Sequence, residues 1–394
     1  MARETRLRWI LPLAASYISF GWFWGSWSVV FLDFLHSRHF SYGRVSVYLT
    51  SLTIASMVTM VLITPRIAHL LPSASLPLAL GFFGAGIALM PWVPDTWLLF
   101  AFAVTGIGTG LIDVLVNQIG HDLEVGSGKS VLQPVHAAYS VGAVLGAVCS
   151  ALILEDGGPS AFRAAIFLAA GLQALPFAAC LLSPAYRVGP RGERSAETMS
   201  LSAFVRNPAL LVVALIVLSA FFVEGSLDVW AVTYLRVTLD ATVLAGAFGF
   251  AAFAAATAIG RLFAARILFG MGYRRTIVLS GIGSAAAGTV ALFTPSPMVA
   301  SVAYLVLGFS LASAAPAAFG TVGGEGAEAG ISISAVTTVG YTGFVVGPPV
   351  MGWLADAVGV QATMAIITAA TLGILLGGFL SRSGTPPDQE LSAS

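Results

Sequence analysis

The chain has 394 residues, of which 57% are hydrophobic and only 9% are charged. Soluble globular domains carry about 25% charged residues, so this composition excludes a soluble protein and predicts an integral membrane protein. The formal net charge is zero, which gives no basis for binding nucleic acid. Two cysteines, Cys149 and Cys180, lie in apolar runs without ligand spacing and predict neither a disulfide framework nor a metal site.

Hydropathy predicts an all-α protein with twelve membrane-spanning helices, each close to the about 20 residues that cross a bilayer core. The first follows a basic amino terminus and is interpreted as an uncleaved span, because the apolar stretch 9–35 is longer than a signal-peptide core. The predicted spans are 10–33, 43–64, 75–93, 97–120, 132–154, 160–182, 208–234, 241–265, 275–294, 297–320, 331–355 and 360–380.

A long polar connection divides the predicted helices into two sets of six. The predicted domains are a six-helix bundle at 1–182, a cytoplasmic linker at 183–207, a second six-helix bundle at 208–381 and a cytoplasmic tail at 382–394. Most arginines fall on one side of the spans, and the positive-inside rule then places both termini in the cytoplasm. An excess of arginine over lysine, with abundant alanine and glycine, indicates a bacterial source, and so a bacterial cytoplasmic membrane.

The two halves share small-residue patterns at an offset of 200 or 201 residues. The matching pairs are Gly25 with Gly225, Gly142 with Gly343, and Gly146 with Gly347. A steady offset across two helix pairs supports a duplication. Two parallel six-helix repeats are a transporter architecture, in which the solute is held near mid-membrane between the repeats.

The seventh predicted span contains two carboxylates, Glu224 and Asp228. Intramembrane acids are costly unless a cavity, a partner or a proton relieves them, and they usually mark ion or solute routes. Because the two acids are four residues apart, they share one face of the helix. Glu224 lies nearest mid-depth and is the first candidate for a proton carrier. A buried polar bond that locks helices together is the structural alternative.

Polar residues also follow the fourth predicted span, where Asp113, Asn117 and His121 recur at intervals of four and form one stripe. The fifth span opens with His136 and Tyr139, and His136 lies at a depth comparable with Asn117. We predict that His136 pairs with Asn117 or Asp113 and either contacts solute or relays protons. A purely structural hydrogen bond is the alternative for His136.

An aromatic stripe runs along the first predicted span. Its members are Tyr17, Phe20, Trp24, Trp27 and Phe31. Such stripes more often pack in a core or face lipid, but a stripe that faces a cavity offers rings on which a sugar stacks. Because Trp24 aligns with Glu224 in the repeat, we predict that Trp24 and Trp27 shape the solute cavity. No nucleophile–base pair or metal-ligand cluster is apparent, which predicts no enzyme and no cofactor.

These residues resemble the major facilitator superfamily. The segment 260–275 looks like the cytoplasmic loop that follows the second helix of each half in that family, whereas its first-half counterpart, 65–69, lacks the usual acid. The resemblance implies two six-helix bundles in the major facilitator fold. It also implies gating roles for the arginines of the segment, which are Arg261, Arg266, Arg274 and Arg275.

Within the superfamily, the chain looks most like the bacterial branch near the fucose permeases and rhizopine-type transporters. Four patterns carry this resemblance: Asp113-x3-Asn117, His136-x2-Tyr139, Glu224-Gly225-x4-Trp230 and Gly340-Tyr341-x-Gly343. Fucose permeases use an acid in the first span for proton coupling, and the middle of the first span here has none. The resemblance therefore moves any coupling role to Glu224, Asp228 or Asp113.

The sequence thus predicts a monomeric secondary active transporter that moves a small polar solute, sugar or polyol-like, by alternating access coupled to proton symport. The predicted solute-binding residues are Trp24, Trp27, Asn117, His136, Tyr139, Trp230 and Tyr341. Two alternatives stay open. One is a proton-coupled exporter of drugs or metabolites, and the other is a non-transporting membrane receptor or scaffold.

Overall fold

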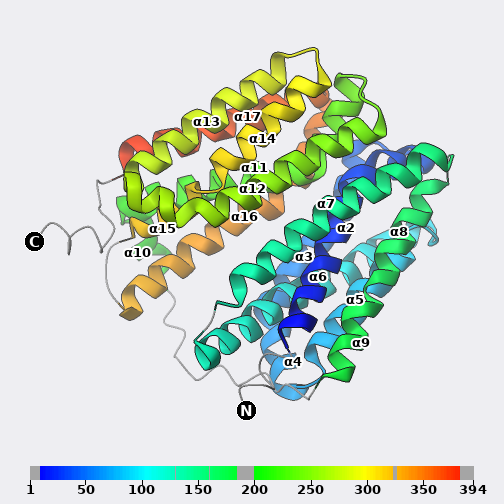
Figure 1. Ribbon diagram of the computed structural model, residues 1–394, viewed down its shortest axis with the longest axis horizontal. Coiled ribbons are helices and arrows are strands. Elements are labelled where there is room, and N and C mark those ends of the chain that lie inside the picture. The colour runs from blue at the N-terminus through cyan, green and yellow to red at the C-terminus, as the bar shows by residue number, and fades with distance from the viewer. Residues whose placement is uncertain (1–8, 129, 159, 184–198, 323–325, 382–394) are drawn as a thin grey trace, which may run out of the picture. The chain divides into compact units, whose positions relative to one another are not determined.

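The computed structural model of the protein describes residues 9–128, 130–158, 160–183, 199–322 and 326–381, and these contain helices and no strand (Figure 1). Eleven helical stretches in this described part are long and apolar enough to cross a membrane. At the position of the third predicted span lies α5 (Ser75–Leu89), an apolar helix of 15 residues. The predicted all-α fold is confirmed, with one span shorter than the rest.

The chain divides into two compact units, Met1–Gly192 and Glu193–Ser394. The predicted linker and tail lie largely outside the described residues, so the predicted domain boundaries stay a prediction. The helices of the first unit are α2 (Ile10–Ser37), α3 (Tyr42–Val58), η1 (Thr59–Ile63), α4 (Thr64–Leu70), α5, α6 (Asp95–Ser127), α7 (Leu132–Asp156), α8 (Ala161–Leu172) and α9 (Ala174–Leu182).

The second unit repeats this order of long apolar helices. Its helices are α10 (Leu201–Val205), α11 (Pro208–Thr238), α12 (Val243–Met271), α13 (Tyr273–Phe293), α14 (Pro297–Leu311), α15 (Ala314–Gly320), α16 (Gly326–Val358) and α17 (Val360–Leu380). Two of the predicted spans are interrupted by a short break. One break lies between α8 and α9, and the other lies between α14 and α15. At both positions the sequence predicts one continuous helix.

The segment 260–275, which the resemblance identifies as a loop, is almost entirely helical. The α12 helix continues through Arg261 and Arg266 to Met271, and α13 begins at Tyr273. Gly272 alone joins them, at a φ of 75° that glycine adopts without strain. The placement of these arginines in a loop is therefore corrected: Arg261 and Arg266 lie inside α12, and Arg274 and Arg275 lie in the first turn of α13. Their gating roles stay predictions.

Glycines allow α2 and α7 to pack closely in the first unit. A Cβ added at Gly25 would collide with the carbonyl of Ala143, and one added at Gly142 would collide with the carbonyl of Ile18. Small residues at a helix crossing let backbones approach in this way, as is typical of membrane helices. Each helix therefore has glycines at the crossing, and the backbone of the other helix packs directly against them.

The same crossing recurs between α11 and α16 in the second unit. A Cβ added at Gly225 would lie 2.6 Å from the carbonyl oxygen of Phe344, and one at Gly343 would lie 2.5 Å from that of Leu218. Each of these residues is offset by 200 or 201 positions from its counterpart in the first unit. The duplication that the sequence predicts is thus present in the contacts of each unit.

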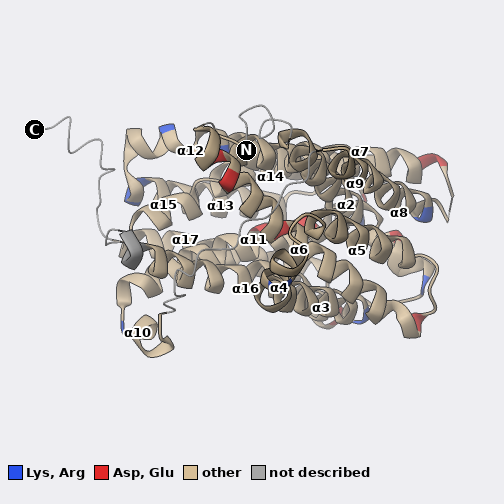
Figure 2. Ribbon diagram, turned by 90° about the horizontal axis from the view of Figure 1, so that it is seen from below, with Lys and Arg blue, Asp and Glu red and all other residues tan. Residues whose placement is uncertain are grey.

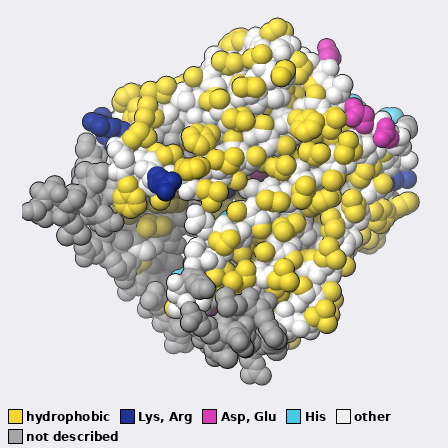
Figure 3. Space-filling model, in the orientation of Figure 1, with side chains coloured by type: hydrophobic (Ala, Val, Ile, Leu, Met, Phe, Trp, Pro, Cys, Tyr) yellow, Lys and Arg dark blue, Asp and Glu magenta, His cyan; other side chains and the backbone are white. Residues whose placement is uncertain are grey.

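The outer surfaces of the helices are apolar. Large hydrophobic side chains are exposed there, among them Leu11 at 72% and Phe293 at 75%. Hydrophobic side chains cover most of the face seen in Figure 3, and charged residues are sparse along the helices in Figure 2. Such helices are suited to lipid, because in a soluble protein these side chains would be buried.

Candidate functional site

A hydrogen-bonded cluster in the first unit joins α2 to α6 through the Tyr17 hydroxyl. This hydroxyl donates to the Asp113 carboxylate at 3.2 Å and accepts from the Asn117 side-chain nitrogen at 3.0 Å. The same nitrogen donates to the main-chain carbonyl of Asp113 at 2.7 Å. Tyr17 itself is buried, whereas Asp113 and Asn117 are half-buried. The cluster therefore presents a carboxylate and an amide at its partly open side.

His136 extends this cluster to α7. Its Nε2 lies 3.0 Å from the Asn117 Oδ1, which confirms the predicted pairing of the two residues. The orientation of the amide follows from its neighbours, because the main-chain carbonyl of Asp113 only accepts hydrogen bonds and must face the amide nitrogen. The amide oxygen then faces His136, so Nε2 of His136 carries a proton and donates it. The exposed imidazole is in this way held in one orientation.

Aromatic rings border the same cluster. The Tyr17 ring lies edge-on to His136, with centroids 5.2 Å apart, and to Tyr139, with centroids 6.2 Å apart. Tyr139 also lies 5.8 Å from the Phe20 ring. Tyr139 is half-buried, so the polar groups of the cluster are flanked by an aromatic wall. Tyr17, which the sequence placed only in an aromatic stripe, is the residue that connects the cluster.

The start of α7, which carries His136, is fixed by Glu124 of α6. The Glu124 carboxylate accepts hydrogen bonds from the main-chain N–H groups of Val131 and Leu132, at 2.7 and 3.1 Å. These N–H groups belong to the set that a helix start leaves without intrahelical partners. A negative charge is also favourable at a helix amino terminus. Glu124 therefore positions the first turn of α7 beside the cluster.

Replacing Tyr17 by phenylalanine is expected to destabilise the protein by about 1–2 kcal/mol, because it removes two hydrogen bonds, one of them to a carboxylate. Thermal unfolding of the purified protein measures this change. In a double-mutant cycle, Tyr17→Phe and Asp113→Asn should show a coupling free energy of about 0.5 kcal/mol or more. Strictly additive effects of the two substitutions would contradict the observed connection.

The second unit holds a different polar arrangement, an ion pair inside its apolar helices. Arg261 of α12 donates to the Glu224 carboxylate, near the middle of α11, at 2.6 Å. The Glu224 side chain is 17% exposed and the Arg261 side chain 47%. The sequence predicts Glu224 as the first candidate for a proton carrier and Arg261 as a gating residue. The structure makes the two residues partners, and both roles stay predictions.

Asp228 lies one helical turn after Glu224 and is half-buried. The charges that act on its carboxylate are those of Glu224 and Arg261. The predicted shared face of the two acids on α11 is therefore confirmed, and Arg261 joins it from the neighbouring helix. Two carboxylates and one guanidinium form the charged group of this unit, here named the α11–α12 charge cluster.

Glycines next to this cluster hold its helices in place. Gly225 lies against Phe344 of α16, as described above. On α12, a Cβ added at Gly260 would lie 2.9 Å from the main-chain carbonyl oxygen of Phe309. Neither α11 nor α12 can rotate at these positions without moving a backbone. The packing of α11 against α16 and of α12 against α14 therefore limits how Glu224 and Arg261 can move.

The remaining predicted site residues fall into two groups. Trp27 and Trp230 are buried, with 1% and 0% of their surface exposed. Trp27 packs among aromatic rings that include Phe34 and Phe102. The Trp230 indole donates a hydrogen bond to the main-chain carbonyl of Pro348 at 3.1 Å. Both side chains are packed between helices, and their contact with solute stays a prediction. Trp24 and Tyr341 are half-buried and stay candidates for solute contact.

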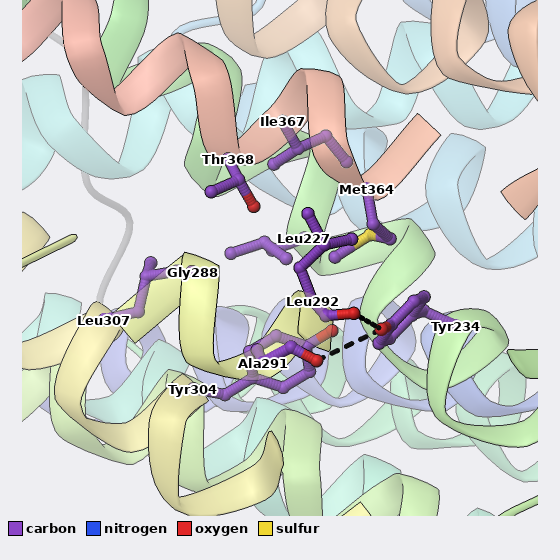
Figure 4. A pocket seen from close by; sticks show the side chains of 10 residues that line it. All are labelled: Leu227, Tyr234, Gly288, Ala291, Leu292, Tyr304, Leu307, Met364, Ile367 and Thr368. Carbon is purple, nitrogen blue, oxygen red and sulfur yellow. Dashed lines mark hydrogen bonds between the residues drawn. The ribbon is translucent and has the colours of Figure 1, made fainter. Parts of the chain in front are cut away.

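A small cavity in the second unit lies beside α11 but contains none of the predicted residues (Figure 4). Leu227, Met364 and Ile367 are among the side chains that line it. The Tyr234 hydroxyl at its edge donates to the main-chain carbonyls of Ala291 and Leu292, at 3.1 Å each. This cavity has an apolar lining. Among the described residues, no group of three or more His, Cys, Asp or Glu side chains could hold a metal ion.

Comparison with known proteins gives a consistent set of matches. The profile of the Major Facilitator Superfamily matches residues 13–343. An uncharacterized MFS-type transporter of Yersinia pestis is 27% identical over 261 residues, which cover 66% of this chain and 66% of that protein, slightly less than two thirds of its length. The membrane protein MosC of Rhizobium meliloti is 26% identical over 292 residues, which cover 73% of this chain and 70% of MosC.

Two solved structures have a similar fold. A bacterial homologue of the human lysosomal transporter Spinster, inward-facing and occupied, matches with a TM-score of 0.78 at 14% identity, covering 96% of this chain and 97% of that chain. The nucleoside transporter NupG matches with a TM-score of 0.72 at 14% identity, covering 94% of this chain and 98% of NupG. At this level of identity, the likeness shows the fold alone.

Proposed function

Because this chain belongs to the Major Facilitator Superfamily, we propose that it moves a small polar solute, a sugar or polyol-like compound, by alternating access coupled to protons. The family consists of membrane transporters, so the chain is a multi-pass membrane protein and not an enzyme, as the sequence predicts. The proposed direction is uptake by proton symport across a bacterial cytoplasmic membrane. The proposed carrier is a monomer with both termini in the cytoplasm.

The cluster around Tyr17 is the observation that supports a sugar or polyol-like solute. Asp113, Asn117 and His136 combine hydrogen-bond donors and acceptors within one hydrogen-bonded group. A polyhydroxyl solute has hydroxyl groups that donate and accept in alternation, and such groups match this mixed set. The flanking ring of Tyr139 adds a flat face of the kind on which a sugar ring stacks. We therefore assign solute contact to Asn117, His136 and Tyr139, and a coupling role to Asp113.

Proton coupling is proposed from the α11–α12 charge cluster. Carboxylates within apolar helices are rare and usually belong to ion or proton routes. Glu224 and Asp228 share one cation, Arg261, so binding of one proton would balance the charge of the group. The resemblance to the branch near fucose permeases and rhizopine-type transporters is consistent with this role. Membership of that branch stays a prediction.

The solute class is tested first by binding. Sugars, polyols and drugs are screened against the purified protein by thermal shift at several pH values, because a ligand that binds the native state raises its apparent stability. A polyol or sugar should raise the melting temperature of the wild type and raise it less for Asn117→Ala. Thr289→Ala, an exposed site on α13, serves as the control and should respond like the wild type. A screen in which only drugs stabilise the protein would contradict the solute class.

Transport of the best ligand is then measured in proteoliposomes. Uptake should increase when an inward proton gradient is imposed and should fall when an ionophore removes the gradient. An uptake rate that is the same with and without the proton gradient would contradict proton coupling.

The alternatives give different results in the same system. An exporter would lower the content of the ligand in intact cells instead of raising it. A receptor or scaffold would bind ligand without any flux.

A further inference from the structure

The α11–α12 charge cluster has an unequal number of opposite charges. Glu224 and Asp228 are two potential anions, and Arg261 is one cation. On the helices packed against α11, the other ionisable or phenolic side chains in the described part are Arg266 on α12, Tyr304 on α14, and Tyr341 and Asp356 on α16. Of these, none is among the charges that act on Asp228. With both acids ionised, the cluster keeps one uncompensated negative charge.

An uncompensated charge inside apolar helices is costly, and the simplest relief is a proton on one carboxylate. The geometry distinguishes the two acids. Glu224 has a direct charge-assisted bond with the Arg261 guanidinium at 2.6 Å, and such bonds stabilise the ionised form of an acid. For Asp228, no hydrogen bond or ion pair from a described side chain is observed, although the charge of Arg261 acts on it.

We propose that Asp228 is the proton-binding residue of the second unit, and that the Glu224–Arg261 ion pair sets its occupancy at one proton. The inference rests on the proposed proton coupling and specifies the residue that performs it. The proton is taken from water onto a carboxylate oxygen and returns to water when the O–H bond breaks. Glu224 and Arg261 act as positioning residues.

Close packing supports this division of roles. Gly225, between the two acids, lies against the backbone of Phe344, so α11 cannot turn to bring Asp228 to the guanidinium in place of Glu224. Arg261 would have to move instead. While the ion pair holds, a neutral Asp228 makes the cluster electrically neutral, and an ionised Asp228 gives it one negative charge. The cluster is therefore expected to bind and release one proton.

The test is infrared spectroscopy of the full chain in an alkyl maltoside detergent, which has no ester carbonyl to mask the signal, and it needs no solute. A protonated carboxylic acid has a C=O stretching band that a carboxylate lacks. The wild type should show such a band at neutral pH, and Asp228→Asn should lose it. Glu224→Gln should show the band only at lower pH, because removing one of the two anions leaves the charge of Arg261 to balance Asp228. Asp240→Asn is the control, because Asp240 is exposed outside the helices and its φ of 52° suits asparagine.

A further variant separates this proposal from a merely structural role. Arg261→Gln removes the cation, so Glu224 should become protonated as well and the band should approximately double in area. Adding Glu224→Gln to that variant should return the band to its wild-type area.

A wild type without the band, or a band that persists in Asp228→Asn, would overturn the proposal. A protein that shows the expected bands but transports no solute would instead refute the proposed function alone.

Discussion

Replacing Gly25 by alanine is expected to destabilise the protein by about 1–3 kcal/mol, the usual cost of forcing extra atoms into a packed interior. The added Cβ has no space, because it meets the backbone of Ala143 in α7 rather than a side chain that could turn away. Thermal unfolding in detergent measures the effect as a lower apparent melting temperature. The equivalent change in the second unit, Gly225→Ala, should cost less, because its nearest atom lies farther away, at 2.6 Å.

Gly81→Ala is the matched control for this prediction. Gly81 lies in α5, and a Cβ added there meets nothing within 4 Å. Alanine in a helix interior is more favourable than glycine by about 0.5–1 kcal/mol, so this variant should melt at or above the wild-type temperature. If Gly25→Ala also melts at or above the wild-type temperature, the close crossing of α2 and α7 is not present in solution.

Replacing Arg261 by glutamine is expected to destabilise the second unit by about 1–3 kcal/mol. This range lies between the values for exposed ion pairs and for buried pairs that lose one partner, because Glu224 is mostly buried and Arg261 is half-exposed. Without the guanidinium, the acid at position 224 has no cation beside it. Thermal unfolding near neutral pH measures the loss, and lowering the pH should reduce it, because a protonated acid does not need a cation partner.

Glu224→Gln supplies the matched comparison. It leaves Arg261 without its carboxylate, but the long arginine side chain can turn its charged end toward water. The single change Glu224→Gln should therefore cost less than Arg261→Gln. The double variant should be more stable than Arg261→Gln alone, and a double variant as unstable as the sum of both changes would contradict the ion pair.

Much of the fold follows from the sequence, because the bilayer sets the length of a helix and hydropathy marks its position. The observed helices lie at the predicted spans, and the 200-residue repeat reappears as the Gly25 and Gly225 crossings. The connection within the segment 260–275 was predicted too long. Its arginines resemble a family loop, but charge does not end a helix, and Gly272 is the residue that does.

The site was predictable only where it depends on local spacing. Asp113 and Asn117 share a helical face through their interval of four, and His136 could be matched to Asn117 by depth. Tyr17 and Arg261 could not be placed, because their partners are 96 and 37 residues away in the chain. Which long-range pairs meet is decided by helix packing, and no local pattern in a single sequence records it.

The crossings of α2 with α7 and of α11 with α16 depend on main-chain atoms and on the absence of a side chain at glycine. Every amino acid supplies the same main-chain atoms, so the architecture of each unit does not depend on the identity of most side chains that its helices carry. One ancestral unit could therefore be copied and its two descendants could acquire unrelated chemistry. A hydrogen-bonded group around Tyr17 in one and an ion pair around Arg261 in the other are the result of that freedom.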